Sequence, residues 1–351
     1  MSIDWGSATD PTGYAAIVRS AFGSGAARAE DAATHLLPPM LALECLQIEI
    51  TSWCNFACQQ CTRTKLIAQG KWQNEHIPLE RYRNIIEKVP RTRQIYLQGV
   101  GEPSMHPHFV ELVRLASDSE KFDSIHFNSN GHTHDDAYWR SLGNAGYRGL
   151  TVALSVDSLD PVIAERCRSG TKADLLWHRL QLFRDSFTWF IVALVASRLN
   201  LTDIEQTLRK IGRLGGVPVQ ITRMMSDDES VVLRPEDEAY LAERIAAIRA
   251  EFPDLQLYFN AHNSGFSPNE KRCVAPFLSP FIRADGLLTP CCCALETTHY
   301  AGVRADDDRT WDEIRSDPRV LGWVRSFIDE DPTVCQGCTL NPNQKTRVRT
   351  V

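Results

Sequence analysis

The sequence has no concentration of positive charge and no long hydrophobic run. Its 38 Lys and Arg residues stand against 44 Asp and Glu residues, a net charge of −6, and the one basic cluster is the short tail at Lys345, Arg347 and Arg349. Proteins that bind nucleic acid normally carry a basic patch, so we expect no nucleic-acid partner. The apolar stretch at 189–196 is far shorter than the roughly 18 residues of a membrane span, so we expect no membrane association.

The amino-terminal segment carries neither the basic region nor the apolar region of an export signal. We therefore expect a cytoplasmic protein. Hydrophobic residues make up 43% of the chain and charged residues 23%, which is ordinary globular composition and excludes disordered, collagen-like and coiled-coil classes. A chain of 351 residues predicts two domains, or one large barrel with an appendage.

Eleven cysteines are too few for a disulfide scaffold of this length, and their spacing is not that of chance core packing. They form a first group at Cys54, Cys58 and Cys61, a second group at Cys273, Cys291, Cys292, Cys293, Cys335 and Cys338, and two isolated residues, Cys45 and Cys167. In a reducing compartment, clustered thiols indicate metal or iron–sulfur ligands.

Short β-rich runs alternate with amphipathic segments from residue 45 onward. We predict strands at 46–51, 94–98, 124–128, 150–155, 191–196 and 218–222, and helices at 79–89, 109–117, 175–187, 204–214 and 236–250. Thr202 with Glu205 predicts a capping box, and Pro235 predicts a first helical turn. This alternation predicts a parallel sheet, in an open doubly wound fold or a partial barrel, with the chemistry at the carboxyl ends of the strands.

Three thiols follow the first predicted strand on one tight loop, Cys54, Cys58 and Cys61. Three thiolates can hold three irons of a four-iron cluster and leave the fourth iron open to a substrate or cofactor. A closed zinc site needs four ligands, and no fourth lies nearby in the sequence. An iron–sulfur site is therefore the better interpretation.

This CX3CX2C loop resembles that of the radical S-adenosylmethionine (radical SAM) superfamily, and the resemblance covers roughly residues 45–225. Gly99, Gly101, Glu102 and Pro103 resemble the Gly-Gly-Glu-Pro element that holds the methionine amino group, with Val100 between the two glycines. Asn130 stands in an Asn-Gly turn. The resemblance implies further cofactor contacts at strand ends from Ser155, Asp157, Ser197 and Asn200. Arg168 is a candidate for binding the cofactor carboxylate, and a solvated arginine at a helix end is the equal alternative.

The second cysteine group could fill a zinc site or all corners of another iron–sulfur cluster. The stretch from Cys273 to Cys293 resembles the SPASM/twitch extension of radical SAM enzymes, which carries auxiliary clusters. The resemblance implies one auxiliary 4Fe-4S cluster, held by Cys273, Cys291, Cys335 and Cys338, with Cys292 as the alternative to Cys291. Cys293 and Cys45 are assigned to packing.

Taken together, these features predict an α/β chain with three parts. Residues 1–44 form an Ala-rich helical cap, residues 45–255 a partial (β/α)6 TIM-like barrel, and residues 256–351 a small carboxyl-terminal iron–sulfur domain. The cofactors implied by the resemblance are a 4Fe-4S cluster, the auxiliary 4Fe-4S cluster and S-adenosylmethionine, with a flavodoxin or ferredoxin-type electron donor.

The implied activity is abstraction of a hydrogen atom from an unactivated carbon. Cys167, just beyond the fourth strand, is a candidate hydrogen-atom donor, and core packing is the alternative. His106 and His108 are read as surface or core residues. Residues 1–44 look too short for a peptide-recognition domain, so we expect a sugar or aminocyclitol carbinol substrate, with epimerisation or oxidation; the alternative is a maturase acting on a ribosomally made peptide. A non-catalytic zinc or electron-transfer protein would not explain Glu102.

Overall fold

The computed structural model describes residues 43, 45–224, 226, 228–259, 279–292 and 302–329. The expected helical cap lies outside these residues apart from Leu43. So do Cys273, Cys293, Cys335 and Cys338.

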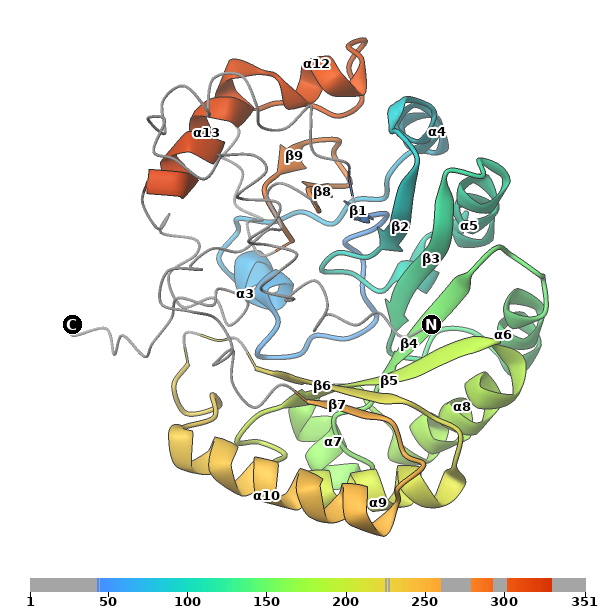
Figure 1. The fold of residues 1–351 in the computed structure, drawn as a ribbon, viewed down its shortest axis with the longest axis vertical. Coiled ribbons are helices and arrows are strands. Elements are labelled where there is room, and N and C mark those ends of the chain that lie inside the picture. Colours follow the sequence, from blue (N-terminus) through green and yellow to red (C-terminus); the bar gives the residue numbers. More distant parts are fainter. Residues whose placement is uncertain are drawn as a thin grey trace, which may run out of the picture.

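A single curved sheet forms the centre of the described structure (Figure 1). Its strands are β1 (Cys45–Ile48), β2 (Thr92–Leu97), β3 (Phe122–Ser129), β4 (Leu150–Ser155), β5 (Trp189–Ala196), β6 (Val219–Arg223), β7 (Leu257–Phe259), β8 (Phe281–Ile282) and β9 (Leu288–Thr289). They lie in the order β7-β6-β5-β4-β3-β2-β1-β8-β9. All neighbours are parallel except β8 and β9, which form an antiparallel hairpin.

Most of the helices connect the strands and cover the convex side of the sheet, whereas the helix at Thr62–Ala68 lies on its open side (Figure 1). The described helices are α3 (Thr62–Ala68), α4 (Leu79–Lys88), the 3-10 turn η1 (Pro103–Met105), α5 (Phe109–Asp118), α6 (Asp136–Gly143), α7 (Pro161–Cys167), α8 (Ala173–Ser186), α9 (Ile204–Leu214), α10 (Pro235–Glu251), α12 (Trp311–Arg315) and α13 (Pro318–Asp329). The described helices include none that is both long and apolar enough to span a bilayer.

The two faces of the sheet differ in polarity because successive side chains of a strand point to opposite sides. On β1, Leu46 and Ile48 are fully buried in the hydrophobic core, whereas Gln47 and the following Glu49 belong to the other face. The convex face therefore packs on the helices. The concave face carries the polar side chains.

The expected α/β fold, with a parallel sheet in a partial barrel, is confirmed. The sheet continues past residue 255, because β7 pairs with β6 and β8 pairs with β1. Pro235 begins α10 as predicted. The capping box predicted at Thr202 is wrong: the residue before α9 is Asp203, which makes no side-chain cap and instead accepts hydrogen bonds from Ser158 and Thr207.

Candidate active site

The first cysteine group lies on the loop between β1 and α3. The Sγ of Cys54 accepts a hydrogen bond from the backbone N–H of Phe56 at 3.4 Å, and the N–H of Cys61 donates to the carbonyl of Cys58 at 3.0 Å. All three cysteines are half-buried. The buried Arg63 fixes the loop by donating to the carbonyl of Phe56 at 3.4 Å. The sequence therefore places three thiols on one ordered loop at the carboxyl end of β1.

The surroundings of these thiols fit iron ligation. Burial raises the pKa of Cys54 to about 11 and also raises that of Cys58. A thiolate is the form that binds metal, and a bound metal offsets the cost of burying its charge. Within the described residues, no three His, Cys, Asp or Glu side chains are grouped closely enough to hold a single ion. A four-iron cluster takes each thiolate on a different iron.

The glycine-rich loop at 99–102 follows β2 and packs directly on the cysteine loop. The N–H of Glu102 donates to the carbonyl of Trp53 at 2.7 Å. A Cβ on Gly101 would come within 2.4 Å of the carbonyl oxygen of Thr51, so the close approach requires glycine. The predicted proximity of these two strand ends is thus a backbone-to-backbone contact.

The carboxylate of Glu102 is buried and joins the ends of β2 and β3. Its Oε1 accepts hydrogen bonds from the hydroxyls of Ser104 at 2.6 Å and Ser129 at 2.8 Å, and its Oε2 accepts from the N–H of Asn130 at 2.7 Å. The amide of Asn130 donates to the Oδ1 of Asn55 at 2.7 Å, which continues the network to the cysteine loop. The predicted contact of Glu102 with the methionine amino group stays a prediction.

Asp157 and Arg168 form an ion pair beyond the end of β4, two residues after Ser155. The Nε of Arg168 lies 2.7 Å from the Oδ2 of Asp157, whose Oδ1 accepts from the N–H of Val195 at 2.9 Å. Burial raises the pKa of Cys58, and the positive charge of Arg168 opposes that rise. The pair therefore lies beside the cysteine loop, and the predicted contact of Arg168 with the cofactor carboxylate stays a prediction.

Asn200 ties the end of β4 to the end of β5. Its amide nitrogen donates to the carbonyls of Asp157 at 2.8 Å and Val195 at 2.9 Å, and its Oδ1 accepts from the N–H and hydroxyl of Ser197 at 2.9 and 3.1 Å. Two donors and two acceptor positions are all that a carboxamide has. Asn200 can therefore act on a cofactor only by positioning its neighbours.

Cys167 is the last residue of α7 and is 5% exposed. Burial raises its pKa to about 12, and the nearby carboxylate of Asp157 adds to the rise. The thiol is therefore protonated at neutral pH, which a hydrogen-atom donor requires and a packed core thiol shares. Its role stays a prediction.

The structure does not bring Cys291 and Cys292 to the first cysteine group. Both follow β9, which runs antiparallel to β8, while β8 runs parallel to β1. The chain therefore leaves β9 toward the end of the sheet where β1 begins, whereas Cys54 follows the end where β1 finishes. Cys291 and Cys292 therefore follow the end of the sheet opposite to that of Cys54.

Sequence reasoning missed a row of carboxamides on the concave face. The Nδ2 of Asn128 donates to the Oε1 of Gln98 at 3.4 Å, Gln98 donates to Gln47 at 3.0 Å, and Gln47 donates to the hydroxyl of Ser279 at 2.9 Å. The row crosses β3, β2, β1 and the start of β8. Polar residues at alternate positions of the predicted strands were the signal for it.

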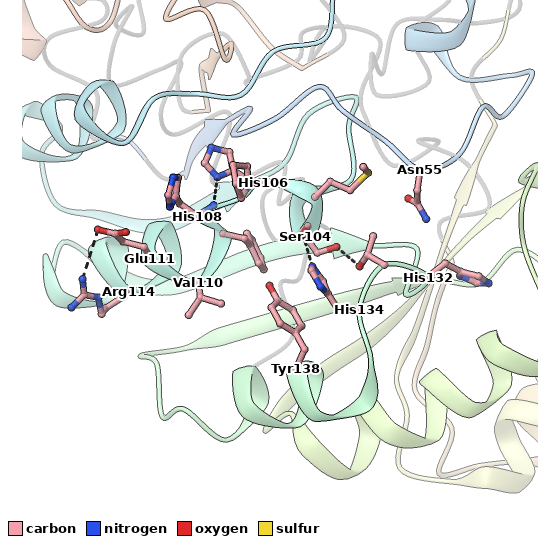
Figure 2. Close-up of a pocket in the computed structure, with 14 residues that line it drawn as sticks. Asn55, Ser104, His106, His108, Val110, Glu111, Arg114, His132, His134 and Tyr138 are labelled. Carbon is pink, nitrogen blue, oxygen red and sulfur yellow. Dashed lines mark hydrogen bonds and ion pairs between the residues drawn. The ribbon is translucent and has the colours of Figure 1, made fainter.

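A cavity of about 690 Å³ opens between α5 and α6 (Figure 2). Its walls come from the loops after β2 and β3, with Ser104, His106, His134 and Tyr138 among them and Asn55 at the cysteine-loop side. None of the predicted cofactor residues lines it. His106 is buried, with its Nε2 2.9 Å from the carbonyl oxygen of Ile77, and so belongs to the core as expected.

Six curated proteins align with parts of the chain, among them the two that follow. The tungsten-containing aldehyde ferredoxin oxidoreductase cofactor-modifying protein of Pyrococcus furiosus is 29% identical over 106 residues, which are 29% of this chain and 28% of that protein. The sporulation killing factor maturation protein SkfB of Bacillus subtilis is 22% identical over 262 residues, 73% of this chain and 61% of that protein. The chain thus spans less than two thirds of either relative.

The solved structures of Streptococcus suis SuiB have the same fold. SuiB bound to S-adenosylmethionine matches with a TM-score of 0.67 and 14% identity, over 85% of this chain and 72% of that one. SuiB bound to its precursor peptide SuiA matches with a TM-score of 0.65 and 15% identity, over 85% and 70%. Residues 48–211 match the Radical SAM superfamily, whose cofactors are a 4Fe-4S cluster and S-adenosylmethionine. The chain therefore carries a radical SAM domain at residues 48–211.

Proposed function

We propose that this chain is a radical SAM enzyme that modifies a ribosomally made peptide. The observation that carries the proposal is the extent of the likeness to a peptide maturation protein: the alignment with SkfB covers 73% of this chain and extends beyond the radical SAM domain. The fold match to SuiB, which was solved with a precursor peptide, supports it. The expected sugar or aminocyclitol substrate has no such support among these relatives, so the peptide alternative takes its place.

In this proposal, the thiolates of Cys54, Cys58 and Cys61 hold three irons of the first cluster. When bound, the cluster and S-adenosylmethionine supply the deoxyadenosyl radical that abstracts a hydrogen atom from the substrate. The protein binds and orients both cofactors and excludes water from them. An external flavodoxin or ferredoxin-type protein delivers the electron.

The loops beside the cysteine loop orient S-adenosylmethionine. The backbone of the segment at 99–102 and the carboxylate of Glu102 receive the methionine amino group, and the guanidinium of Arg168, held by Asp157, receives the carboxylate. Such charge-assisted contacts are stronger than neutral hydrogen bonds. The remaining assigned cofactor residues are Gly99, Gly101, Pro103, Asn130, Ser155 and Ser197, and Asn200 acts by positioning the ends of β4 and β5.

The concave face of the sheet offers a surface suited to a peptide. The carboxamides of Gln47, Gln98 and Asn128 each present donors and an acceptor, as a peptide backbone does. Asn128 is exposed and Gln98 is half-buried, so both retain accessible surface on this face. We assign this row to substrate binding.

The second part of the proposal concerns the fate of the substrate radical. In it, Cys273, Cys291, Cys335 and Cys338 would hold the auxiliary cluster. Such a cluster would supply one-electron chemistry, through which the peptide would be oxidised, for example by cross-linking. If Cys167 instead returns a hydrogen atom to the opposite face of the peptide carbon, the carbon is epimerised. The sulfur radical left on Cys167 is then reduced by an electron from the external donor and a proton from solvent.

The test is turnover by the anaerobically reconstituted protein. The protein would receive S-adenosylmethionine, a strong reductant and one of two panels of candidate substrates. One panel holds synthetic peptides, and the other holds free sugars and aminocyclitols. The amount of 5′-deoxyadenosine formed would be quantified. The proposal expects a peptide of the first panel to raise 5′-deoxyadenosine formation and to change in mass or in stereochemistry. Cys54→Ala, which removes one cluster ligand, should abolish both. Stimulation by a sugar alone would contradict the peptide assignment, and full cleavage by Cys54→Ala would contradict the cluster assignment.

A further inference from the structure

Glu49 is a buried carboxylate to which the cluster and cofactor assignments give no role. It follows β1 directly, is 1% exposed, and its N–H donates to the carbonyl of Ile282 at 2.8 Å. A carboxylate is costly to bury unless hydrogen bonds compensate it. The hydrogen-bond partners of Glu49 therefore account for its burial.

Those partners belong to two segments far apart in the sequence. The Oε1 of Glu49 accepts the N–H of Val100 at 3.0 Å, and its Oε2 accepts the N–H of Ala284 at 3.4 Å. Val100 lies in the glycine-rich loop, and Ala284 lies in the turn of the β8–β9 hairpin that leads to Cys291. One carboxylate thus holds both segments.

The loop is shaped to receive this carboxylate. A Cβ on Gly99 would come within 2.4 Å of the Cγ and Oε1 of Glu49, so the glycine leaves the space that the carboxylate fills. Burial raises the pKa of Glu49, while the two backbone N–H groups and the charge of Arg283 oppose the rise. The contact is therefore specific to this side chain at this place.

We propose that Glu49 is a positioning residue for S-adenosylmethionine. By holding the peptide of Val100, it fixes the orientation of the adjoining Gly101 and Glu102, and by holding Ala284 it ties that orientation to the auxiliary-cluster hairpin. The proposal rests on the assignment of the loop at 99–102 to S-adenosylmethionine.

The chain offers a matched control at the same hairpin turn. Arg81 donates to the carbonyl of Ala284 at 2.8 Å and pairs with Asp306 at 2.7 Å. Arg81→Ala therefore loosens the hairpin but leaves the bond between Glu49 and Val100 in place.

The experiment compares Glu49→Gln, Glu49→Leu, Arg81→Ala and the unaltered protein. Each is reconstituted anaerobically, its iron content is measured, and the Kd for S-adenosylmethionine is determined without reductant. Glutamine keeps one acceptor and leucine keeps none. Loss of a charge-assisted bond is expected to weaken binding about tenfold or more in Glu49→Leu, less in Glu49→Gln, and not at all in Arg81→Ala, with equal iron content throughout.

Three results would overturn the proposal. The first is an unchanged Kd in Glu49→Leu. The second is an Arg81→Ala variant weakened as much as Glu49→Leu, because that would make the effect one of general hairpin stability. The third is iron loss in both Glu49 variants, because the residue would then hold the cysteine loop instead. Failure of the unaltered protein to bind S-adenosylmethionine would count against the proposed function, which separates the two ideas.

Discussion

At the scale of single residues, the thiol of Cys167 distinguishes two chemistries. If it donates a hydrogen atom, Cys167→Ala should still cleave S-adenosylmethionine and abstract hydrogen from the substrate, but the epimer should not form. Turnover in heavy water should then place deuterium at the inverted carbon of the product made by the unaltered protein, because a thiol hydrogen exchanges with solvent. Mass spectrometry and chiral amino-acid analysis of the product would measure both.

Packing alone predicts a different outcome for the same change. A buried Cys→Ala substitution would cost about 1 kcal/mol of stability and leave the product as it was. An unaltered product without solvent deuterium would remove the donor role and favour oxidation through the auxiliary cluster.

Two buried imidazoles predict a pH dependence of folding. Burial lowers the pKa of His106 and of His126 to about 4, below the roughly 6.5 of an exposed histidine. The unfolded chain therefore binds these protons more readily, so their contribution to stability is complete above about pH 6.5 and is lost as the pH falls toward 4. The expected loss is on the order of 1.4 kcal/mol per pH unit for each group.

Urea unfolding of the cluster-free protein at a series of pH values would measure this slope. His126→Gln should reduce it by the share of one group, because glutamine does not titrate. A slope in His126→Gln equal to that of the unaltered protein would show that burial of this imidazole does not set the pH dependence.

At the scale of elements, α7 depends on its amino-terminal cap. The Oδ1 of Asp160 accepts the N–H groups of Val162 at 3.0 Å and Ile163 at 2.9 Å. Asp160→Ala should lower the free energy of unfolding by about 1 kcal/mol, since two helix N–H groups lose their acceptor. Urea denaturation would measure the loss.

The start of α8 provides the control for this cap. Lys172 precedes that helix and makes no side-chain cap. Lys172→Ala should therefore change stability little, and an equal loss in both variants would contradict the capping explanation.

Elements with strong periodicity could be predicted from the sequence, and short or tertiary features could not. The helix at 204–214 was predicted with its observed bounds, because its apolar residues recur with helical spacing. The residue before this helix was not predicted correctly, because the carboxylate of Asp203 accepts a hydrogen bond from Ser158, a residue distant in the sequence. The strands β7, β8 and β9 have only two or three residues each, too few to show a period.

The parts of the candidate site that could be predicted from the sequence are those whose residues lie close together along the chain. The cysteine spacing and the order of the strand ends are local, and the structure places residues 53–61, 99–102 and 130 in direct contact. The roles of Glu49 and of the carboxamide row could not be predicted, because each joins strands that lie far apart in the sequence. No spacing along the chain encodes the pairing of β1 with β8.

At the scale of the whole molecule, the two cysteine sites should function separately. The unaltered protein should hold two four-iron clusters, about eight irons. Replacing Cys273, Cys335 and Cys338 together should remove one cluster, because the first group has three ligands of its own on the loop after β1. Cleavage of S-adenosylmethionine should survive while peptide modification fails, as measured by iron content, 5′-deoxyadenosine and product mass.

A zinc ion in place of the second cluster, in protein prepared without oxygen, would contradict this prediction. So would loss of both clusters in the triple variant, because it would mean that the two sites depend on each other for assembly.

The most direct measurement of the central claim is the transfer of deuterium from substrate to cofactor. Peptides that stimulate turnover would be synthesised with deuterium at each candidate carbon and incubated with the reconstituted protein, S-adenosylmethionine and reductant. Peptide modification by radical hydrogen abstraction predicts deuterium in the 5′-deoxyadenosine from one labelled position. Deuterium-free 5′-deoxyadenosine from every labelled peptide that is modified would contradict it.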